Sequence, residues 1–309
     1  MYVFVLTYNE EVMFTNMYND QFVNEHFKPH DIKFIVLDNG DQPLIKEWCE
    51  KHNYIHYPTE FNIGSAGGYN WIFKLAYMMD LDNAILMQSD VELSNSEPLF
   101  FTETLVDTFG RDFIITWPQE MNNFWLNDES KLEPYVHDAP NLGNFVGFNP
   151  KVLKEKDCYF DYNYVVTHID DIEYKQWMRK HNLMDTLNPA HLLRHNTEQY
   201  YKTEESKWYG GMSKYFVISS STFTIKTHHA SIGIDHLTKN IVNSHEQWLE
   251  INQPYYELVL QNNLTRIPYD HERWTQFGYP KFPVEHELKR FSILHPELII
   301  HHSPYMILH

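Results

Sequence analysis

The sequence is poor in cysteine and in long apolar runs. Its two cysteines, Cys49 and Cys158, cannot form a disulfide framework, and neither lies in a metal-binding spacing. No apolar run approaches the roughly 18 residues that a membrane-spanning helix needs. The apolar segment 1–7 lacks a cationic flank and a cleavage site, so we interpret it as a strand rather than a signal peptide. We therefore expect a cytoplasmic protein with reduced thiols.

Basic residues are also scarce, with 24 Lys and Arg against 42 Asp and Glu and a net charge of −18. The imbalance is concentrated in residues 1–150, which contain 7 basic and 23 acidic residues, whereas residues 151–230 contain 11 and 10. Such acidity repels DNA phosphates and anionic lipids, which argues against tight non-specific binding to either. A basic group in the middle segment keeps a weaker, local version open: Arg179, Lys180, Arg194, Lys202 and Lys207.

Signature motifs of several enzyme classes are missing as well. The chain has no Gly-x-Ser-x-Gly elbow, no phosphate-binding Gly-Lys-Ser/Thr loop and no His-Glu-x-x-His. A hydrophobic content of 43% and an aromatic content of 16% nevertheless predict a packed globular protein.

Short apolar runs alternate with helical patterns along the first part of the chain. The expected strands are residues 3–6, 32–37, 54–56, 84–87 and 113–117, with a further strand at 141–148. This alternation predicts an α/β fold with a mostly parallel central sheet flanked by helices. Helical runs near 245–250 and 283–294 predict a helical C-terminal extension.

Polar residues follow three of the predicted strands at their carboxyl ends. They are Thr7-Tyr8-Asn9, Asp38-Asn39 and Gln88-Ser89-Asp90. Because parallel strands of such sheets bind ligands at this edge, we expect these side chains to converge on one site.

A glycine-rich stretch, Asn62 to Asn70, leads from the third strand into an apolar helix. We interpret it as a loop whose backbone approaches a diphosphate, beside a carboxylate suited to a divalent cation. It is not the dinucleotide-binding fingerprint, because it does not follow the first strand.

A second acidic group, Asp170-Asp171-Ile172-Glu173, opens a helix that extends to about Lys180. Asp171 lies one turn before Tyr174, so we place it on the inward face of this helix, where the helix dipole favours an ionised carboxylate. Downstream come His191 and His195 and an aromatic, basic stretch that includes Trp208.

The order of these motifs resembles the family 2 glycosyltransferases of GT-A (Rossmann-like) fold, with the rhamnosyltransferase-like branch closest. The resemblance covers about residues 1–215, and its most specific part is the asparagine- and glycine-rich stretch. It implies a nucleotide-sugar-binding half at 1–117, an acceptor and catalytic half of the same domain at 118–230, and the extension at 231–309.

The resemblance also implies a role for individual residues. Asp171 would be the general base of an inverting transfer, and Asp90 a metal ligand with His195. Tyr8 would flank the nucleotide base, and Asp38 would contact its edge with Asn39. The remaining donor-binding residues would be Thr7, Asn9, Asn62, Gly64, Ala66, Gly67, Gly68, Asn70 and Ser89.

The chain departs from the family pattern at Gln88, which stands where the first acid of the metal site is expected. Glutamine offers a neutral oxygen without charge, which weakens metal binding. Further candidate residues are Gln88, Glu92, Asp170 and Trp208. Plainer roles stay open: Asp90 or Asp170 as a helix cap, and His195 as a surface residue.

These motifs imply a glycosyltransferase that uses a UDP- or dTDP-linked sugar with Mn²⁺ or Mg²⁺. The acceptor would be a soluble glycan, a small molecule or a hydroxymethylated base of phage DNA. The last option follows from the many Asn, Tyr and Phe residues, which an AT-rich genome such as a bacteriophage's encodes. A non-catalytic nucleotide-sugar-binding protein of the same fold is the alternative.

Overall fold

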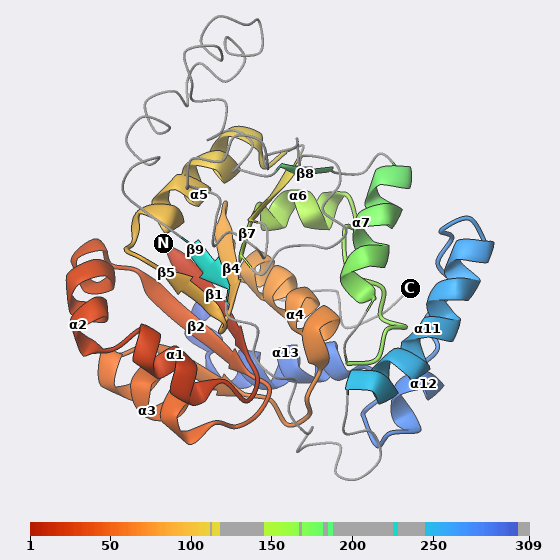
Figure 1. Ribbon diagram of the computed structural model, residues 1–309, viewed down its shortest axis with the longest axis horizontal. Helices are drawn as coiled ribbons and strands as arrows, with labels where there is room; N and C mark the ends of the chain where they lie inside the picture. The colour runs from red at the N-terminus through yellow and green to blue at the C-terminus, as the bar shows by residue number, and fades with distance from the viewer. Residues whose placement is uncertain are drawn as a thin grey trace, which may run out of the picture.

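The computed structural model describes residues 1–111, 113–117, 145–166, 169–181, 185–187, 225–227 and 245–301. Seven strands form a central sheet in the order β3-β2-β1-β4-β7-β6-β8 (Figure 1). The bounds of these strands are β1 Tyr2–Thr7, β2 Lys33–Asp38, β3 Ile55–Pro58, β4 Ala84–Gln88, β6 Phe113–Trp117, β7 Phe145–Phe148 and β8 Asp185–Leu187. Strands β5 (Val91–Leu93) and β9 (Ile225–Thr227) form a second, antiparallel pair.

The central sheet is mostly parallel. β1 pairs in parallel with β2 and β4, β2 with β3, and β6 with β8. Only β7 is antiparallel to its two neighbours among the described strands, β4 and β6. The α/β class predicted from the alternating pattern is therefore confirmed.

Helices flank the sheet and follow the predicted runs closely. Those before the extension are α1 Glu11–Met17, α2 Asp20–Phe22, α3 Pro43–His52, α4 Gly64–Met78, α5 Glu97–Phe109, α6 Pro150–Glu155 and α7 Asp170–Lys180. A π-helical turn at Val23–Phe27 and a 3₁₀ turn at Lys28–His30 follow α2. α6 begins where Asn149 caps it by accepting hydrogen bonds from Lys151 and Val152.

Alternate side chains of the central strands enter two separate cores. In β1, Val3 and Val5 pack with α1, α3 and α5, whereas Phe4 and Leu6 pack with α4, α7 and α13 (Pro283–Leu294). This alternation is the pleat of a strand that is covered on both faces. The result is a three-layer arrangement whose middle layer is the sheet (Figure 1).

Helix α4 lies in the interior of the second core. Of its 15 residues only Ser65 and Tyr77 are not buried. The helix begins at Gly64, so the predicted loop at Gly64 to Gly68 is wrong: these residues form its first turn. The glycines there permit close packing rather than an open loop, since a Cβ on Gly68 would lie 2.6 Å from Leu6 Cδ1.

The predicted helical C-terminal extension is confirmed. It consists of α11 (His245–Gln261), α12 (Glu272–Thr275), α13 (Pro283–Leu294) and a 3₁₀ turn at Pro296–Leu298. α13 covers α4 and is joined to it by a buried ion pair between Lys74 Nζ and Glu285 Oε1, 2.7 Å apart. On the adjacent strand β3, the Tyr57 hydroxyl donates to the Glu287 carboxylate at 2.6 Å.

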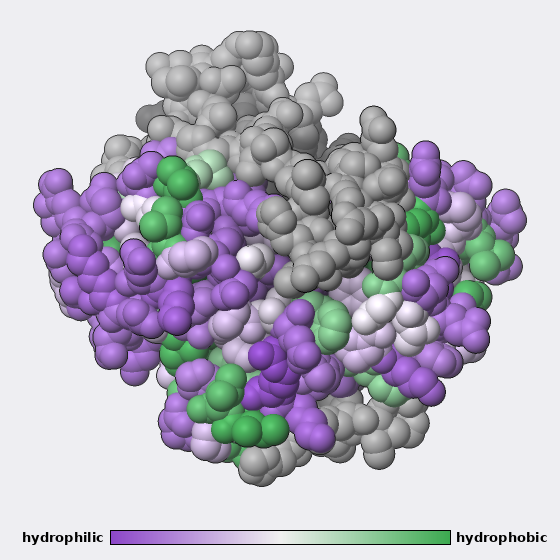
Figure 2. Space-filling model, turned by 90° about the horizontal axis from the view of Figure 1, so that it is seen from below, coloured by the Kyte–Doolittle hydropathy of each residue, from purple (hydrophilic) through white to green (hydrophobic). Residues whose placement is uncertain are grey.

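The visible surface is mainly hydrophilic, with apolar side chains in small, separate patches (Figure 2). Such scattered apolar residues are normal on folded proteins. Within the described ranges, no helix combines the length and the apolar character needed to cross a lipid bilayer.

The start of α4 meets the backbone of residue 166 at very short range. Gly64 has a φ of +71°, and a Cβ on it would lie 1.6 Å from the carbonyl oxygen of Val166. This carbonyl accepts a hydrogen bond from the backbone nitrogen of Ser65 at 2.7 Å. Only glycine fits here, for both its backbone conformation and its missing side chain.

We therefore expect Gly64→Ala to be strongly destabilising. Gly278→Ala is the matched control, because Gly278 has a φ of +85° and no atom within 4 Å of an added Cβ. Gly278→Ala should cost only the backbone strain, about 1–3 kcal/mol. Gly64→Ala should cost about 1–3 kcal/mol more, from forced overpacking. Urea unfolding of both variants measures the difference, and equal losses would contradict the close approach.

Candidate functional site

Three strand ends lie side by side at the carboxyl edge of the sheet. Thr7 at the end of β1 is in register with Asp38 of β2, and Leu6 with Gln88 of β4. The chain beyond each strand stays at this edge, because the nitrogen of Asn39 donates to the Thr7 carbonyl and that of Ser89 to the Leu6 carbonyl. The expected convergence of polar residues is therefore present.

Asp38 is fully buried, and nearby residues of the protein supply its hydrogen bonds. Its carboxylate accepts from the nitrogen of Gly40 at 2.9 Å and from the Gln42 nitrogen and side-chain amide at 2.6 and 2.8 Å, and His56 Nε2 lies at 2.9 Å. Burial raises the pKa of the Asp38 carboxyl, but these contacts outweigh it and hold that pKa below its ordinary value. Contact between Asp38 and a nucleotide base stays a prediction.

Gln42 is a residue of this edge that the sequence did not reveal. Besides Asp38, its side-chain amide nitrogen donates to Thr7 Oγ1 at 3.0 Å, and its oxygen accepts from the nitrogen of Glu10 at 2.7 Å. It thus fixes the segment that carries Tyr8, which is half-buried, and Asn9, which is exposed with a φ of 56°. Nothing in its sequence position distinguishes it from a surface glutamine.

The carboxylates of Glu10 and Asp90 lie near each other at the end of β4. Asp90 is 6% exposed, and its neighbour Ser89 donates a short hydrogen bond to Glu10. Burial raises the pKa of Glu10 to about 7; the Ser89 bond opposes this and the charge of Asp90 adds to it. Glu10 directly follows Thr7-Tyr8-Asn9, which was the available signal, but no role was predicted for it.

The alternative that Asp90 caps the following helix is wrong. The N-cap of α5 is Ser96, and the nitrogen of Glu97 donates to Asn95 Oδ1. Asp90 is instead followed directly by β5, where Val91 is in register with Thr227 and the half-buried Glu92 with Lys226 of β9.

A divalent cation fits the residues around Asp90. Two carboxylates and a hydroxyl in a buried place offer the oxygen ligands that Mg²⁺ and Mn²⁺ prefer. Burial is the main cause of the raised pKa of Glu10 and the charge of Asp90 adds to it, and a bound cation would relieve this added repulsion. Among the described residues, three ligand atoms of His, Cys, Asp or Glu cluster only at Glu60, His286 and Glu287, so the described part of the chain gives Asp90 no complete set of that kind. His195 and Trp208 lie outside the described residues.

The asparagines around the start of α4 hold it in place. Asn62 Oδ1 accepts from the Gly64 nitrogen at 2.9 Å, and the Asn39 side-chain nitrogen donates to the Gly64 carbonyl at 3.3 Å. Asn70 binds both backbone groups of Phe160, at 3.0 and 2.8 Å, and is 1% exposed. Asn39, Asn62 and Ala66 are likewise at most 3% exposed.

The second acidic group lies against this helix start. Asp170 is 3% exposed and accepts a hydrogen bond from Ser65 Oγ at 2.8 Å. Its burial and the charge of Asp171 raise the pKa of Asp170 to about 7, although the Ser65 bond opposes this. The plain N-cap role for Asp170 is wrong, because Ile169 occupies that position and Asp170 is the first residue of α7.

Asp170 is the more deeply buried acid of this pair, and the placement of Asp171 on the inward face stays a prediction. Asp171 is half-buried, and its Oδ1 accepts a hydrogen bond from the nitrogen of Ile172 at 2.8 Å. The difference arises because α7 begins at Asp170 and turns this residue, not the next, toward Ser65. Asp171 is the more accessible of the two carboxylates.

Tyr69 connects the two acidic groups, and sequence reasoning passed over it. Its hydroxyl accepts from the Gln88 side-chain amide at 3.4 Å. Burial raises the pKa of Tyr69, and the charges of Asp171, Asp90 and Asp170 raise it further. Ser65, one turn before Tyr69 on the same helix, contacts α7 directly, since its hydroxyl donates to Asp170 at 2.8 Å. The end of β4, the start of α4 and the start of α7 therefore belong to one site.

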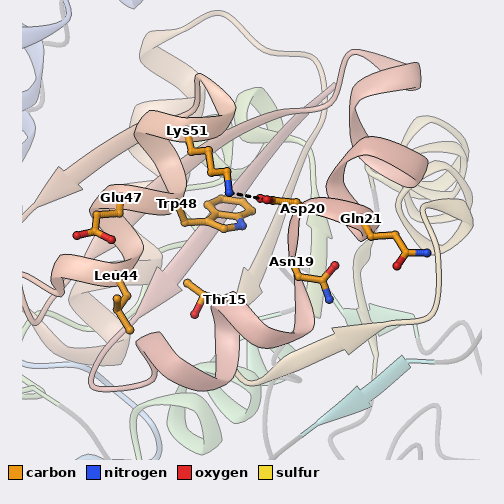
Figure 3. A pocket seen from close by; sticks show the side chains of 8 residues that line it. All are labelled: Thr15, Asn19, Asp20, Gln21, Leu44, Glu47, Trp48 and Lys51. Atoms are coloured by element: carbon orange, nitrogen blue, oxygen red, sulfur yellow. Dashed lines mark hydrogen bonds and ion pairs between the residues drawn. The ribbon is translucent and has the colours of Figure 1, made fainter.

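A separate hollow lies on the outer surface, between α1, α2 and α3 (Figure 3). Trp48 and Thr15 line it, and an ion pair between Lys51 and Asp20 crosses one side. None of the predicted site residues lines it.

Comparison with known proteins gives matches in structure alone. No family model and no curated protein matches the sequence. Similar solved structures include S. aureus TarS 1-349, with 13% identity and a TM-score of 0.40 over 56% of this chain and 53% of that one, so the chain spans about half of its length. The mannosyltransferase PcManGT from Pyrobaculum calidifontis, in complex with GDP-Man and Mn²⁺, matches with 12% identity and a TM-score of 0.44 over 95% of this chain and 86% of that one. Glucosyl-3-phosphoglycerate synthase from Mycobacterium tuberculosis, with Mg²⁺ and UDP, matches with 15% identity and a TM-score of 0.38 over 61% and 68%. At these values the similarity identifies no activity for this chain.

The raised pKa of Asp170 predicts a pH-dependent stability. A folded-state pKa of about 7 against 3.8 means that the native state binds this proton more tightly than the unfolded chain does. The resulting stabilisation is complete below the unfolded pKa and is lost as pH rises through the folded one. Asp170→Asn cannot ionise, so its free energy of unfolding relative to the wild type should increase between about pH 4 and 7.

Urea unfolding across this pH range measures the effect. Asp157→Asn is the control, because Asp157 is exposed and its φ of 52° suits asparagine equally well. A constant difference between Asp170→Asn and the wild type at every pH would contradict the assignment.

Proposed function

We propose that the protein transfers a sugar from a nucleotide-diphosphate sugar to an acceptor hydroxyl. The observation that carries this proposal is that α4 contacts both acidic groups at the carboxyl edge of the parallel sheet, since Tyr69 binds Gln88 and Ser65 binds Asp170. Carboxylates on two neighbouring elements of one edge suit a reaction with an anionic leaving group and a proton to remove. The family 2 resemblance of the motifs names the same chemistry.

The donor would lie across the ends of β1, β2 and β4. Tyr8 and Asn9 are the accessible side chains there, whereas Asp38 and Asn39 are buried and shape the edge from below. Asn62, Gly64 and Asn70 act through the backbone that they hold, since all three are buried. The diphosphate would lie near the start of α4, where the helix dipole favours an anion, although the nitrogens of Gly64 and Ser65 are already bonded to Asn62 and Val166.

Asp171 would remove the proton from the acceptor hydroxyl, which then attacks the anomeric carbon with inversion. A general base must be ionised and must reach the substrate. Asp171 is half-buried, whereas Asp170 is enclosed and has a raised pKa. Asp170 therefore orients the helix start through Ser65, and Asp171 is the residue that can touch an acceptor.

Asp90, with Glu10 and Ser89, would hold Mn²⁺ or Mg²⁺, and His195 stays a predicted fourth partner. A bound divalent cation supplies electrostatic stabilisation of the departing diphosphate. Gln88 would add at most a neutral oxygen, and its amide nitrogen donates to Tyr69.

The acceptor would be a soluble glycan or a small molecule, in the cytoplasm. A hydroxymethylated base of phage DNA is the second choice, against which the net charge of −18 counts. The alternative function is nucleotide-sugar binding without turnover, and the neutral Gln88 in place of an acid favours it.

A thermal-shift screen tests the donor first. UDP, dTDP and GDP and their sugars are each added with and without Mn²⁺, since a ligand that binds only the folded state raises the melting temperature. The nucleotide sugar with the largest shift then serves as the probe in a hydrolysis assay. Metal-dependent release of the nucleoside diphosphate supports a transferase, and binding without release supports the alternative.

We expect Asp171→Asn to keep nucleotide binding and to lose turnover. Loss of a general base should lower the rate about 10²–10⁴-fold, with the thermal shift by the donor unchanged. Asp157→Asn is the control, as an exposed aspartate beyond α6. A near-normal rate for Asp171→Asn would remove this residue from the role.

We expect Asp90→Asn to abolish the part of the thermal shift that depends on Mn²⁺. The variant loses one of the two charges that would hold the cation, so donor binding should no longer respond to metal. Asp31→Asn is the control, because Asp31 is exposed and pairs with Lys33 at the opposite end of β2. An unchanged response to Mn²⁺ in Asp90→Asn would place the metal elsewhere.

A further inference from the structure

An arginine of the C-terminal extension holds helix α7, to which Tyr256 of α11 also donates a hydrogen bond, at Gln176. Arg266 lies between α11 and α12, and its guanidinium binds both carboxylate oxygens of Glu173 in α7, from Nε at 3.0 Å and from Nη2 at 2.9 Å. Its third nitrogen donates to the carbonyl of Tyr159 at 2.8 Å. The guanidinium carbon also lies 3.8 Å from the centre of the Trp177 ring, one turn further along α7.

This arrangement fixes α7 in rotation as well as in position. A two-pronged ion pair allows one orientation of the carboxylate, and stacking on a ring adds a second, independent constraint. Glu173 is fully buried, and burial raises its pKa against the opposing charge of Arg266. Without the arginine, Glu173 would be left as an unpaired buried charge, which it can avoid only by taking up a proton or by moving toward water.

The chain that leads into α7 needs such support. Val166 and Ile169 have φ values of 58° and 68°, a region that β-branched residues rarely adopt. Strained conformations of this kind persist only where the surroundings enforce them. From the side of α4, the nitrogen of Ser65 binds the Val166 carbonyl. From the side of α11, Asn252 binds both backbone groups of Val165, at 3.0 and 2.9 Å.

We propose that Arg266 is a positioning residue for Asp171: by holding Glu173, two residues further along α7, it keeps the base directed at the donor edge. This inference rests on the proposed function. It gives the C-terminal extension a role in turnover, although residues 245–301 contribute no group to the site described above.

The test compares Arg266→Gln and Arg266→Lys with the wild type. We use the hydrolysis of the donor identified by thermal shift, at a temperature where circular dichroism shows every variant folded. Displacement of a base by about 1 Å costs on the order of 10²-fold in rate, so kcat of Arg266→Gln should fall by roughly that factor. The dissociation constant of the nucleoside diphosphate should stay within twofold, because the strand ends are untouched. Arg266→Lys keeps the charge without the fork, and its kcat should lie between the two.

Arg290→Gln is the matched control within the same extension. Arg290 also binds a buried glutamate, Glu287, at 2.5 Å and lies over an aromatic ring, that of Tyr57, but it does not touch α7. The Arg290→Gln variant should therefore have a lower free energy of unfolding and an unchanged kcat. Hydrogen exchange adds a readout that needs no activity, since residues 170–180 should exchange faster in Arg266→Gln and not in Arg290→Gln.

The outcomes separate the two proposals. An active wild type with an unchanged kcat in Arg266→Gln overturns the positioning role, as does an equal fall in kcat for Arg290→Gln. A parallel loss of nucleotide binding in Arg266→Gln also overturns it, because the effect would then be general unfolding. A wild type that binds the donor without any turnover overturns the proposed function, and the positioning role falls with it.

Discussion

The contact between the Val166 carbonyl and the start of α4 joins the two parts of the molecule. One part is the parallel sheet with its polar strand ends, and the other is the segment that leads into α7. Because Gly64 has no side chain, the carbonyl comes close enough for the Ser65 nitrogen to bind it at 2.7 Å, and the Ser65 hydroxyl then reaches Asp170. Gly64 and Ser65 thus fix the position of the acidic group at the start of α7 relative to the one that follows β4. A larger residue at position 64 would separate the groups that the proposed reaction needs together.

The carboxylates at this edge of the sheet differ in how many hydrogen bonds they accept from the protein. Asp38 accepts from three nitrogens, has His56 beside it and has a lowered pKa. Glu10 and Asp170 each have one hydrogen-bonding hydroxyl and a neighbouring acid, and both have raised pKa values. The fully hydrogen-bonded Asp38 has a structural role. Glu10 and Asp170 have fewer hydrogen bonds, and a bound ligand or cation would stabilise their ionised forms. Perturbed carboxylates in a pocket are typical of functional sites.

The sequence predicted the local features of this protein well and its long-range contacts poorly. Strand and helix positions follow from apolar periodicity, which is a local property, and the convergence of Thr7, Asp38 and Gln88 follows from parallel pairing. The glycines of 64–68 were misread, because a tight helix contact and an open loop demand the same residue. Long-range interactions explain the residues that the sequence did not reveal, which are Glu10, Gln42, Tyr69 and Arg266. Their partners lie 32 to 107 residues away in the chain, or their pKa values depend on acidic residues that only the folded chain brings together. No spacing in the sequence encodes such partners.

The burial of α4 by α13 has a consequence for the order of events during synthesis. α4 is apolar on every side, yet its cover arrives late, since Lys74 and Glu285 are 211 positions apart. At about 5–20 residues per second, the ribosome needs roughly 10–40 seconds to deliver the second partner after the first. During this interval an apolar helix and a lysine not yet joined to Glu285 face water or a chaperone. The nascent chain is thus most vulnerable to aggregation before α13 emerges, and a ribosome that stalls in the extension would release a protein with an open core.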